Sequence, residues 1–180
     1  MRVRIAGSQL CKTREDLKKV IIGINRFICC GENNLVKKIL VALDGSTASS
    51  HALNFSLKLA ELTSASLELL TIVPPVFLPS YSMVVLKSEA IADCAKTLEI
   101  SFRGVLSKAQ EEVRKRKHTI KFSTRFEKGE PSEKIIETAK SGGFDLIVMG
   151  SRGLGNRVST LGSVSSRVVD KSSCPVLIVK

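Results

Sequence analysis

The chain has 180 residues, of which 43% are hydrophobic and 25% charged, and this size and balance suit one compact domain with its own core. Its five cysteines show no C-x-x-C spacing, which argues against a disulfide framework or a zinc site, and no apolar run approaches the ~20 residues of a membrane span. The net charge of +11 attracts polyanions, which include nucleotides, nucleic acids and acidic membranes, without choosing among them. These features predict a cytoplasmic protein without a membrane span or a secretion signal.

Residues 1–35 are interpreted as an N-terminal extension. Thr13 and Asp16 resemble a capping box, and apolar residues recur at helical spacing from Leu17 to Ile28, which predicts a short amphipathic helix. Two interpretations stay open: an arm that docks on a partner or on anionic lipid, and a loosely packed appendage. The body, residues 36–180, follows a linker at Gly31–Asn34.

The body opens with a strand, a helix and a second strand. The apolar run Lys37–Leu43 stops at Asp44-Gly45-Ser46, which predicts a buried strand that enters a tight turn. Ser46 or Thr47 then caps a helix. The second strand, Ser66–Val73, ends at Pro74 because proline cannot continue an interior ladder.

Strand and helix patterns continue to the last residue. A loop over 75–87 precedes a long helix, and the basic cluster Arg114–Lys117 is interpreted as its C-terminal cap rather than as a nucleic-acid patch. The remaining predicted elements are a strand over Ile120–Phe126, a helix from Pro131, a strand over Phe144–Met149, a helix from Ser163 and a strand over Pro175–Val179.

Strict alternation of strands and helices predicts an α/β fold. Right-handed crossovers then give a three-layer, open, doubly wound sheet of five parallel strands, order 3-2-1-4-5, with helices on both faces, as in Rossmann-like folds. Ligands of such sheets bind beyond the carboxyl ends of the strands. A site is therefore expected after Leu43, after Val73 and after Met149.

The segment Met149–Val164 joins a buried strand to a helix and carries four glycines. Glycine allows the backbone to approach a ligand closely, and the N–H groups that open the helix at Gly162-Ser163 favour phosphate. Arg152 and Arg157 can add charge-assisted hydrogen bonds to the same oxygens. The pattern indicates a phosphate cradle; the alternative is a surface turn that needs glycine for its shape alone.

Asp44 stands at the end of the first strand, which the expected strand order makes a neighbour of the fourth. A carboxylate there can accept hydrogen bonds from a ribose or from an adenine amine. The alternative is that Asp44 only caps its turn or the following helix.

At these residues the sequence resembles the universal stress protein family, from about Val36 to Lys180. The matches are ILVALDGS from Ile39, FDLIVMGSRG from Phe144, and Gly162-Ser163-Val164 followed by CPVLIV from Cys174. The family's ATP-binding branch carries Gly-x-x-Gly, nine residues, then Gly-Ser or Gly-Thr. The resemblance implies an ATP-binding stress-response or signalling module that is not an enzyme.

The resemblance also implies a set of binding residues. Adenine would lie beside Ala42, Leu43, Asp44 and the backbone of Ile72. Ribose and phosphates would meet Met149, Gly150, Arg152, Gly153, Gly162, Ser163 and Val164. The expected cofactor is ATP with Mg²⁺, and the expected assembly is a homodimer through the last strand, Val176–Val179, without a nucleic-acid or membrane partner.

One departure from the family pattern keeps an alternative open. Eight residues, not nine, separate Gly153 from Gly162, so the chain is also compatible with the family's nucleotide-free branch, acting as a dimeric interaction module. A third and weaker alternative is nucleic-acid binding through the net positive charge.

Other motifs are set aside. Ser141–Asp145 resembles the loop of PP-loop ATP pyrophosphatases, but it closes a helix, so we interpret its glycines as a C-cap. No P-loop pattern occurs, and His51 and His118 lack the partners that metal or triad chemistry requires.

Overall fold

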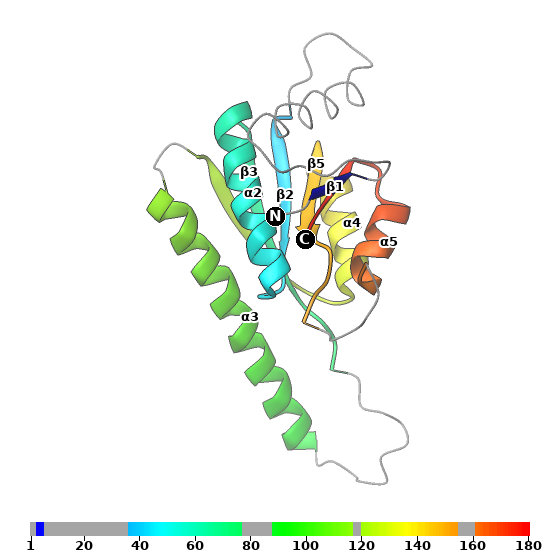
Figure 1. Ribbon diagram of the computed structural model, residues 1–180. Coiled ribbons are helices and arrows are strands. Elements are labelled where there is room, and N and C mark those ends of the chain that lie inside the picture. Colours follow the sequence, from blue (N-terminus) through cyan, green and yellow to red (C-terminus); the bar gives the residue numbers. More distant parts are fainter. Residues whose placement is uncertain (1–2, 6–35, 77–87, 117–119, 155–160) are drawn as a thin grey trace.

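The computed structural model describes residues 3–5, 36–76, 88–116, 120–154 and 161–180 (Figure 1). The helix predicted over 13–28 lies outside these residues. The strands are β1 (Val3–Ile5), β2 (Lys38–Leu43), β3 (Ser66–Val73), β4 (Phe122–Lys128), β5 (Leu146–Gly150) and β6 (Val176–Val179). The helices are α2 (Thr47–Thr63), α3 (Ser88–Arg116), α4 (Pro131–Gly142) and α5 (Ser163–Lys171).

Five strands form a parallel sheet in the order β4-β3-β2-β5-β6. Numbered along the body, this is the predicted order 3-2-1-4-5, so the fold prediction is confirmed. The sequence analysis missed one strand: β1 pairs antiparallel with β6 and makes a sixth strand at that edge. The edge strand expected to form a dimer interface, Val176–Val179, therefore already has a partner within its own chain.

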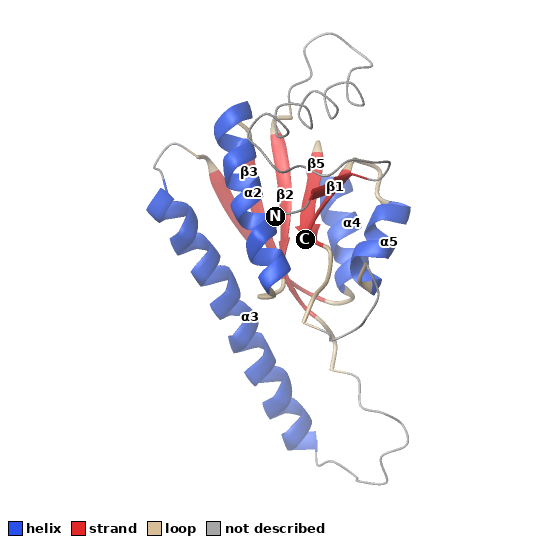
Figure 2. Ribbon diagram, in the orientation of Figure 1, coloured by secondary structure: helices blue, strands red, loops and turns tan. Residues whose placement is uncertain are grey.

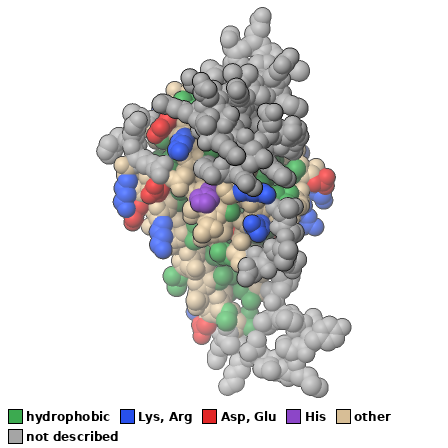
Figure 3. Space-filling model, viewed as in Figure 1, with side chains coloured by type: hydrophobic (Ala, Val, Ile, Leu, Met, Phe, Trp, Pro, Cys, Tyr) green, Lys and Arg blue, Asp and Glu red, His purple; other side chains and the backbone are tan. Residues whose placement is uncertain are grey.

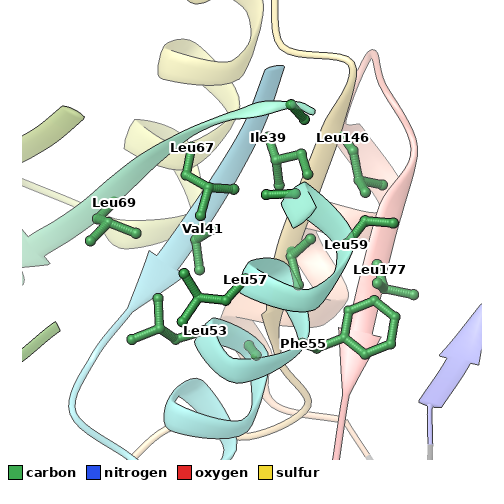
Figure 4. Close-up of a cluster of buried hydrophobic side chains, with 14 of the residues drawn as sticks. Ile39, Val41, Leu53, Phe55, Leu57, Leu59, Leu67, Leu69, Leu146 and Leu177 are labelled. Carbon is green, nitrogen blue, oxygen red and sulfur yellow. The ribbon is translucent and has the colours of Figure 1, made fainter. Parts of the chain in front are cut away.

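Helices cover both faces of the sheet (Figure 2). On one face α2 directs Leu53, Phe55, Leu57 and Leu59 towards leucine, isoleucine and valine side chains of β2, β3, β5 and β6 (Figure 4). On the other face α4 and α5 pack against alternate residues of the same strands, such as Leu40, Leu70 and Ile147. Because residues of both faces are buried, the central strands read as continuous apolar runs.

The helix ends follow the capping signals in the sequence. Ser46 caps α2, its Oγ accepting a hydrogen bond from the N–H of Ser49 at 3.1 Å. Pro131 opens α4, and Gly143 ends it in the left-handed conformation with φ 61°. The interpretation of Ser141–Asp145 as a helix terminus is thus confirmed.

The long helix α3 is longer than the sheet it covers. Its 29 residues span about 43 Å at 1.5 Å per residue, and its first turns extend past the strand ends (Figure 1). Phe102, Ala109 and Val113 are buried, whereas Cys94 is exposed and Ile100 is 70% exposed. The apolar spacing predicted the helix correctly, but only its C-terminal half packs on the core.

Polar contacts hold the middle of α3 against β4. Glu99 forms ion pairs with Lys128 and Arg103, and these two hydrogen bonds lower the pKa of its carboxyl group. The Arg103 guanidinium lies 4.2 Å from the ring centre of Phe126, a cation–π distance. These contacts fix the turn of α3 that carries Phe102.

No helix in the described parts of the chain is long and apolar enough to cross a membrane.

Candidate functional site

A cavity of about 670 Å³ opens at the carboxyl ends of the parallel strands, where the fold class places ligands. All eleven residues predicted for the site line it: Ala42, Leu43, Asp44, Ile72, Met149, Gly150, Arg152, Gly153, Gly162, Ser163 and Val164. They come from β2, β3, β5, the segment after β5 and the start of α5. Topology alone brings these distant segments together, and the volume lies within the range of small-molecule pockets.

Asp44 lies directly beneath the glycine-rich segment. A β-carbon at position 153 would lie 2.6 Å from Oδ2 of Asp44, so a larger residue there would force the carboxylate or the segment to shift. The other carboxylate oxygen, Oδ1, accepts a hydrogen bond from the N–H of Ser46 at 2.9 Å. Asp44 therefore does cap its turn, as the alternative interpretation held, and it also lines the cavity.

The turn after Asp44 joins β2 to the segment after β5. Gly45 has φ +85°, a conformation that strains other residues. The hydroxyl of Ser46 donates a hydrogen bond to the carbonyl of Arg152 at 3.3 Å. The carboxylate and the glycine-rich segment are thus held to each other by protein contacts.

The start of α5 is hydrogen-bonded to the segment that follows β5. The N–H of Gly162 donates to the carbonyl of Ser151 at 2.8 Å, and the Ser165 hydroxyl lies 3.0 Å from the carbonyls of both Ser151 and Gly162. The N-cap residue of α5 is Gly162, and among the described residues no side-chain cap hydrogen bond is formed there. The first N–H groups of the helix have no intrahelical acceptor, and such groups favour an anion.

Part of the cavity lining is apolar. Leu70 and Ile72 of β3, Met149 of β5 and Ile135 of α4 form this part. Gly150 also lines the cavity, but its main constraint is packing, since a β-carbon there would lie 2.8 Å from the backbone of Ala48 in α2. A lining that combines apolar side chains with an anion-favouring helix start suits a ligand that has an apolar part and a negative part.

Twelve of the 23 lining residues were not predicted from the sequence, among them Phe102, Glu130 and Pro131. Glu130 and Pro131 follow β4, and the rule that ligands lie beyond strand ends would have found them had it been applied to the third parallel strand. Phe102 had no such signal, because the sequence does not show which turn of a long helix reaches the cavity.

Glu130 is held in place by neighbours on α4 and α5. Its Oε1 lies 3.3 Å from the hydroxyl of buried Ser132 and 4.0 Å from Nη1 of Arg167. Among the described lining residues, Arg152 is the one cation and Asp44 and Glu130 are the carboxylates. In the described parts of the chain, no cluster of three or more His, Cys, Asp or Glu is placed to hold a metal ion.

The model of the universal stress protein family matches residues 36–180. The chain belongs to this family. The universal stress protein YxiE of Bacillus subtilis is 35% identical over 151 residues, which cover 81% of this chain and 100% of YxiE. A universal stress protein of Methanocaldococcus jannaschii is 34% identical over 161 residues, covering 87% of this chain and 89% of the relative.

Solved structures show the same fold for this universal stress protein. UspA of Lactobacillus plantarum superposes with a TM-score of 0.71 at 23% identity, covering 82% of this chain and 100% of UspA. More distant members of the family have been solved in complex with cAMP, with dAMP (Archaeoglobus fulgidus) and with AMP (Arabidopsis thaliana), at TM-scores of 0.55, 0.54 and 0.52. At 19–23% identity these three support the fold alone.

Proposed function

We propose that this universal stress protein binds ATP, with its Mg²⁺, in the cavity between Asp44 and the start of α5, and that a partner protein reads whether the cavity is occupied. The observation that carries the proposal is the close approach of Gly153 to the carboxylate of Asp44 at the cavity, where a β-carbon would lie 2.6 Å from Oδ2. The same cavity is lined by the Asp44 carboxylate, which can accept a hydrogen bond from adenine or ribose, and by the start of α5, which favours phosphate.

The phosphates would lie at the Gly162–Ser165 turn. The N–H groups of Ser163 and Val164 open α5, and Arg152 lines the same cavity, so the helix dipole and a positive charge would both attract phosphate. The shorter loop does not prevent this arrangement, because Gly162 is hydrogen-bonded to Ser151 across it.

Adenine would pack on the apolar lining near Ile72 and Ile135, with Asp44 beside its polar edge. The ligands named for the solved family members, cAMP, dAMP and AMP, share the adenine base and differ in the sugar or in the linkage of their single phosphate. That common feature supports an adenine nucleotide as the ligand class.

Binding without efficient turnover fits the two carboxylates of the cavity. Asp44 accepts the Ser46 N–H, and Glu130 is engaged by Ser132 and Arg167, so each is tied to a structural partner. A general base for water needs a carboxylate or imidazole within reach of the attacking oxygen. The protein is therefore proposed to act by binding, as a signalling module, and not as an enzyme.

Nucleic-acid binding is less well supported. Figure 3 shows Lys and Arg side chains interspersed with Asp and Glu on the face viewed, without a stripe of one sign. Several described cations are already paired, including Arg125 with Glu68 and Lys134 with Glu137. Nucleic-acid surfaces instead gather unpaired cations along the phosphate track.

A calorimetric titration with ATP and GTP tests the proposal. We expect ATP to bind at micromolar protein concentrations and Asp44→Asn to weaken it by about tenfold, since hydrogen bonds to charged groups contribute ~1.5–3 kcal/mol. Asparagine retains the Oδ1 acceptor for Ser46, so the turn is preserved. Asp170→Asn, an exposed change on α5 away from the cavity, is the matched control and should bind like wild type. Absence of ATP binding to the wild-type protein would refute the proposal and favour the nucleotide-free module.

A further inference from the structure

The outer edge of β6 is covered by β1, a strand that lies outside the family unit. The family model matches residues 36–180, and the whole of YxiE matches 81% of this chain. The five parallel strands are all within the matched residues, whereas β1 is Val3–Ile5. Within the described residues of 36–180, the outer side of β6 has no neighbouring strand, and β1 supplies one from outside the matched residues.

Hydrogen bonds towards β5 fix the direction in which β6 presents its backbone. The carbonyls of Pro175 and Val179 accept N–H groups of Ile147 and Ser151 at 3.0 and 2.7 Å, so both point towards β5. Backbone groups alternate in direction along a strand. The N–H and carbonyl of Ile178 consequently point to the outer edge, where β1 lies.

The register then identifies which residue of β1 bonds to this edge. Arg4 lies opposite Ile178, with Val3 opposite Val179 and Ile5 opposite Leu177. Opposite residues of an antiparallel pair either exchange both hydrogen bonds or neither. Arg4 and Ile178 therefore form a hydrogen-bonded pair, and the N–H groups of Val3 and Ile5 point away from β6.

Without β1, the edge would be open to another chain. β6 is four apolar residues, Val-Leu-Ile-Val, with neither proline nor charge within the strand, and an uncovered edge of this kind is a template for pairing. A second copy related by a twofold axis would present its own β6 antiparallel to the first. That is the direction in which β1 already runs, so β1 and a second β6 compete for the same backbone groups.

We propose that β1 is an intramolecular cover for the β6 edge, and that the β6 of a second copy replaces it when β1 is displaced. The N-terminal strand then sets the balance between monomer and dimer. Because β1 is joined to the body, its pairing is intramolecular, whereas the second copy must come from solution. The proposal concerns the edge of the sheet and is independent of nucleotide binding at the strand ends.

Two proline substitutions in the full-length chain test it. Arg4→Pro removes the N–H that pairs with Ile178, whereas Val3→Pro, the matched control, removes an N–H that points away from β6. Sedimentation across a concentration series should show wild type and Val3→Pro as monomers over a range in which Arg4→Pro forms dimers. The dimerisation constant of Arg4→Pro should lie about tenfold below that of wild type, which is the equivalent of one lost hydrogen bond. ATP titration of the same proteins should give equal affinities.

Amide hydrogen exchange at Ile178 provides the second measurement. In wild type this amide should be protected at every concentration; in Arg4→Pro its protection should be lost on dilution and regained as dimer forms. The proposal is overturned by any of three results: wild type already dimeric in the same range, Arg4→Pro and Val3→Pro with the same oligomeric state, or Arg4→Pro monomeric throughout with Ile178 unprotected.

Discussion

Replacement of Gly153 by valine is expected to weaken ATP binding by about a hundredfold, ~2.7 kcal/mol. A β-carbon at this position would lie 2.6 Å from Oδ2 of Asp44, and valine adds two methyl groups to it. Either the carboxylate or the segment after β5 must shift, and both line the cavity. Titration calorimetry of the variant measures the loss directly.

Gly104→Ala is the matched control for this substitution. Gly104 lies in α3, and no neighbouring atom lies within 4 Å of where its β-carbon would be. Alanine there should leave ATP affinity unchanged and stabilise the helix by ~0.5–1 kcal/mol. If Gly153→Val bound ATP as tightly as Gly104→Ala, the glycine-rich segment would not be part of a nucleotide site.

The largest effect on stability is expected from Phe55→Ala, which should lower the free energy of unfolding by about 3–5 kcal/mol. Phe55 is 2% exposed and points from α2 towards Leu177 of β6 (Figure 4). Its removal leaves a cavity between the helix and the sheet, where the surrounding strands cannot collapse far. Urea unfolding followed by circular dichroism measures the loss.

Leu62→Ala on the same helix provides the comparison. The apolar spacing of α2 includes Leu62, but in the structure this side chain is 55% exposed. Its truncation should change the unfolding free energy by less than about 0.5 kcal/mol. A similar loss for both variants would show that the packing of α2 on the sheet is not the main source of stability.

The parallel sheet could be predicted because local signals and topology agree, whereas the full set of eleven lining residues was implied by the family resemblance. Short apolar runs that end at Asp44-Gly45 and at Gly150 mark buried strands, and strict alternation with helices leaves few topologies. Once the strand order is known, Asp44 and Gly153 must both lie at the carboxyl ends of two neighbouring strands. Capping residues such as Ser46 and Gly143 then set the helix ends to within a few residues.

What could not be predicted depends on contacts without a local signature. β1 is only three residues long, and its strand character exists through pairing with β6. The exposed half of α3 carries the same apolar spacing as the buried half, so periodicity cannot separate them. Phe102 lines the cavity from one turn of this helix, and the spacing does not show which turn that is.

A crystal structure of the full chain grown with ATP and Mg²⁺ is the most direct test of the nucleotide site. We predict density for the base against Ile72 and beside Asp44, and density for the phosphates at the backbone N–H groups of Ser163 and Val164. A cavity that stays empty at saturating ATP, or a nucleotide bound at another surface, would contradict the account.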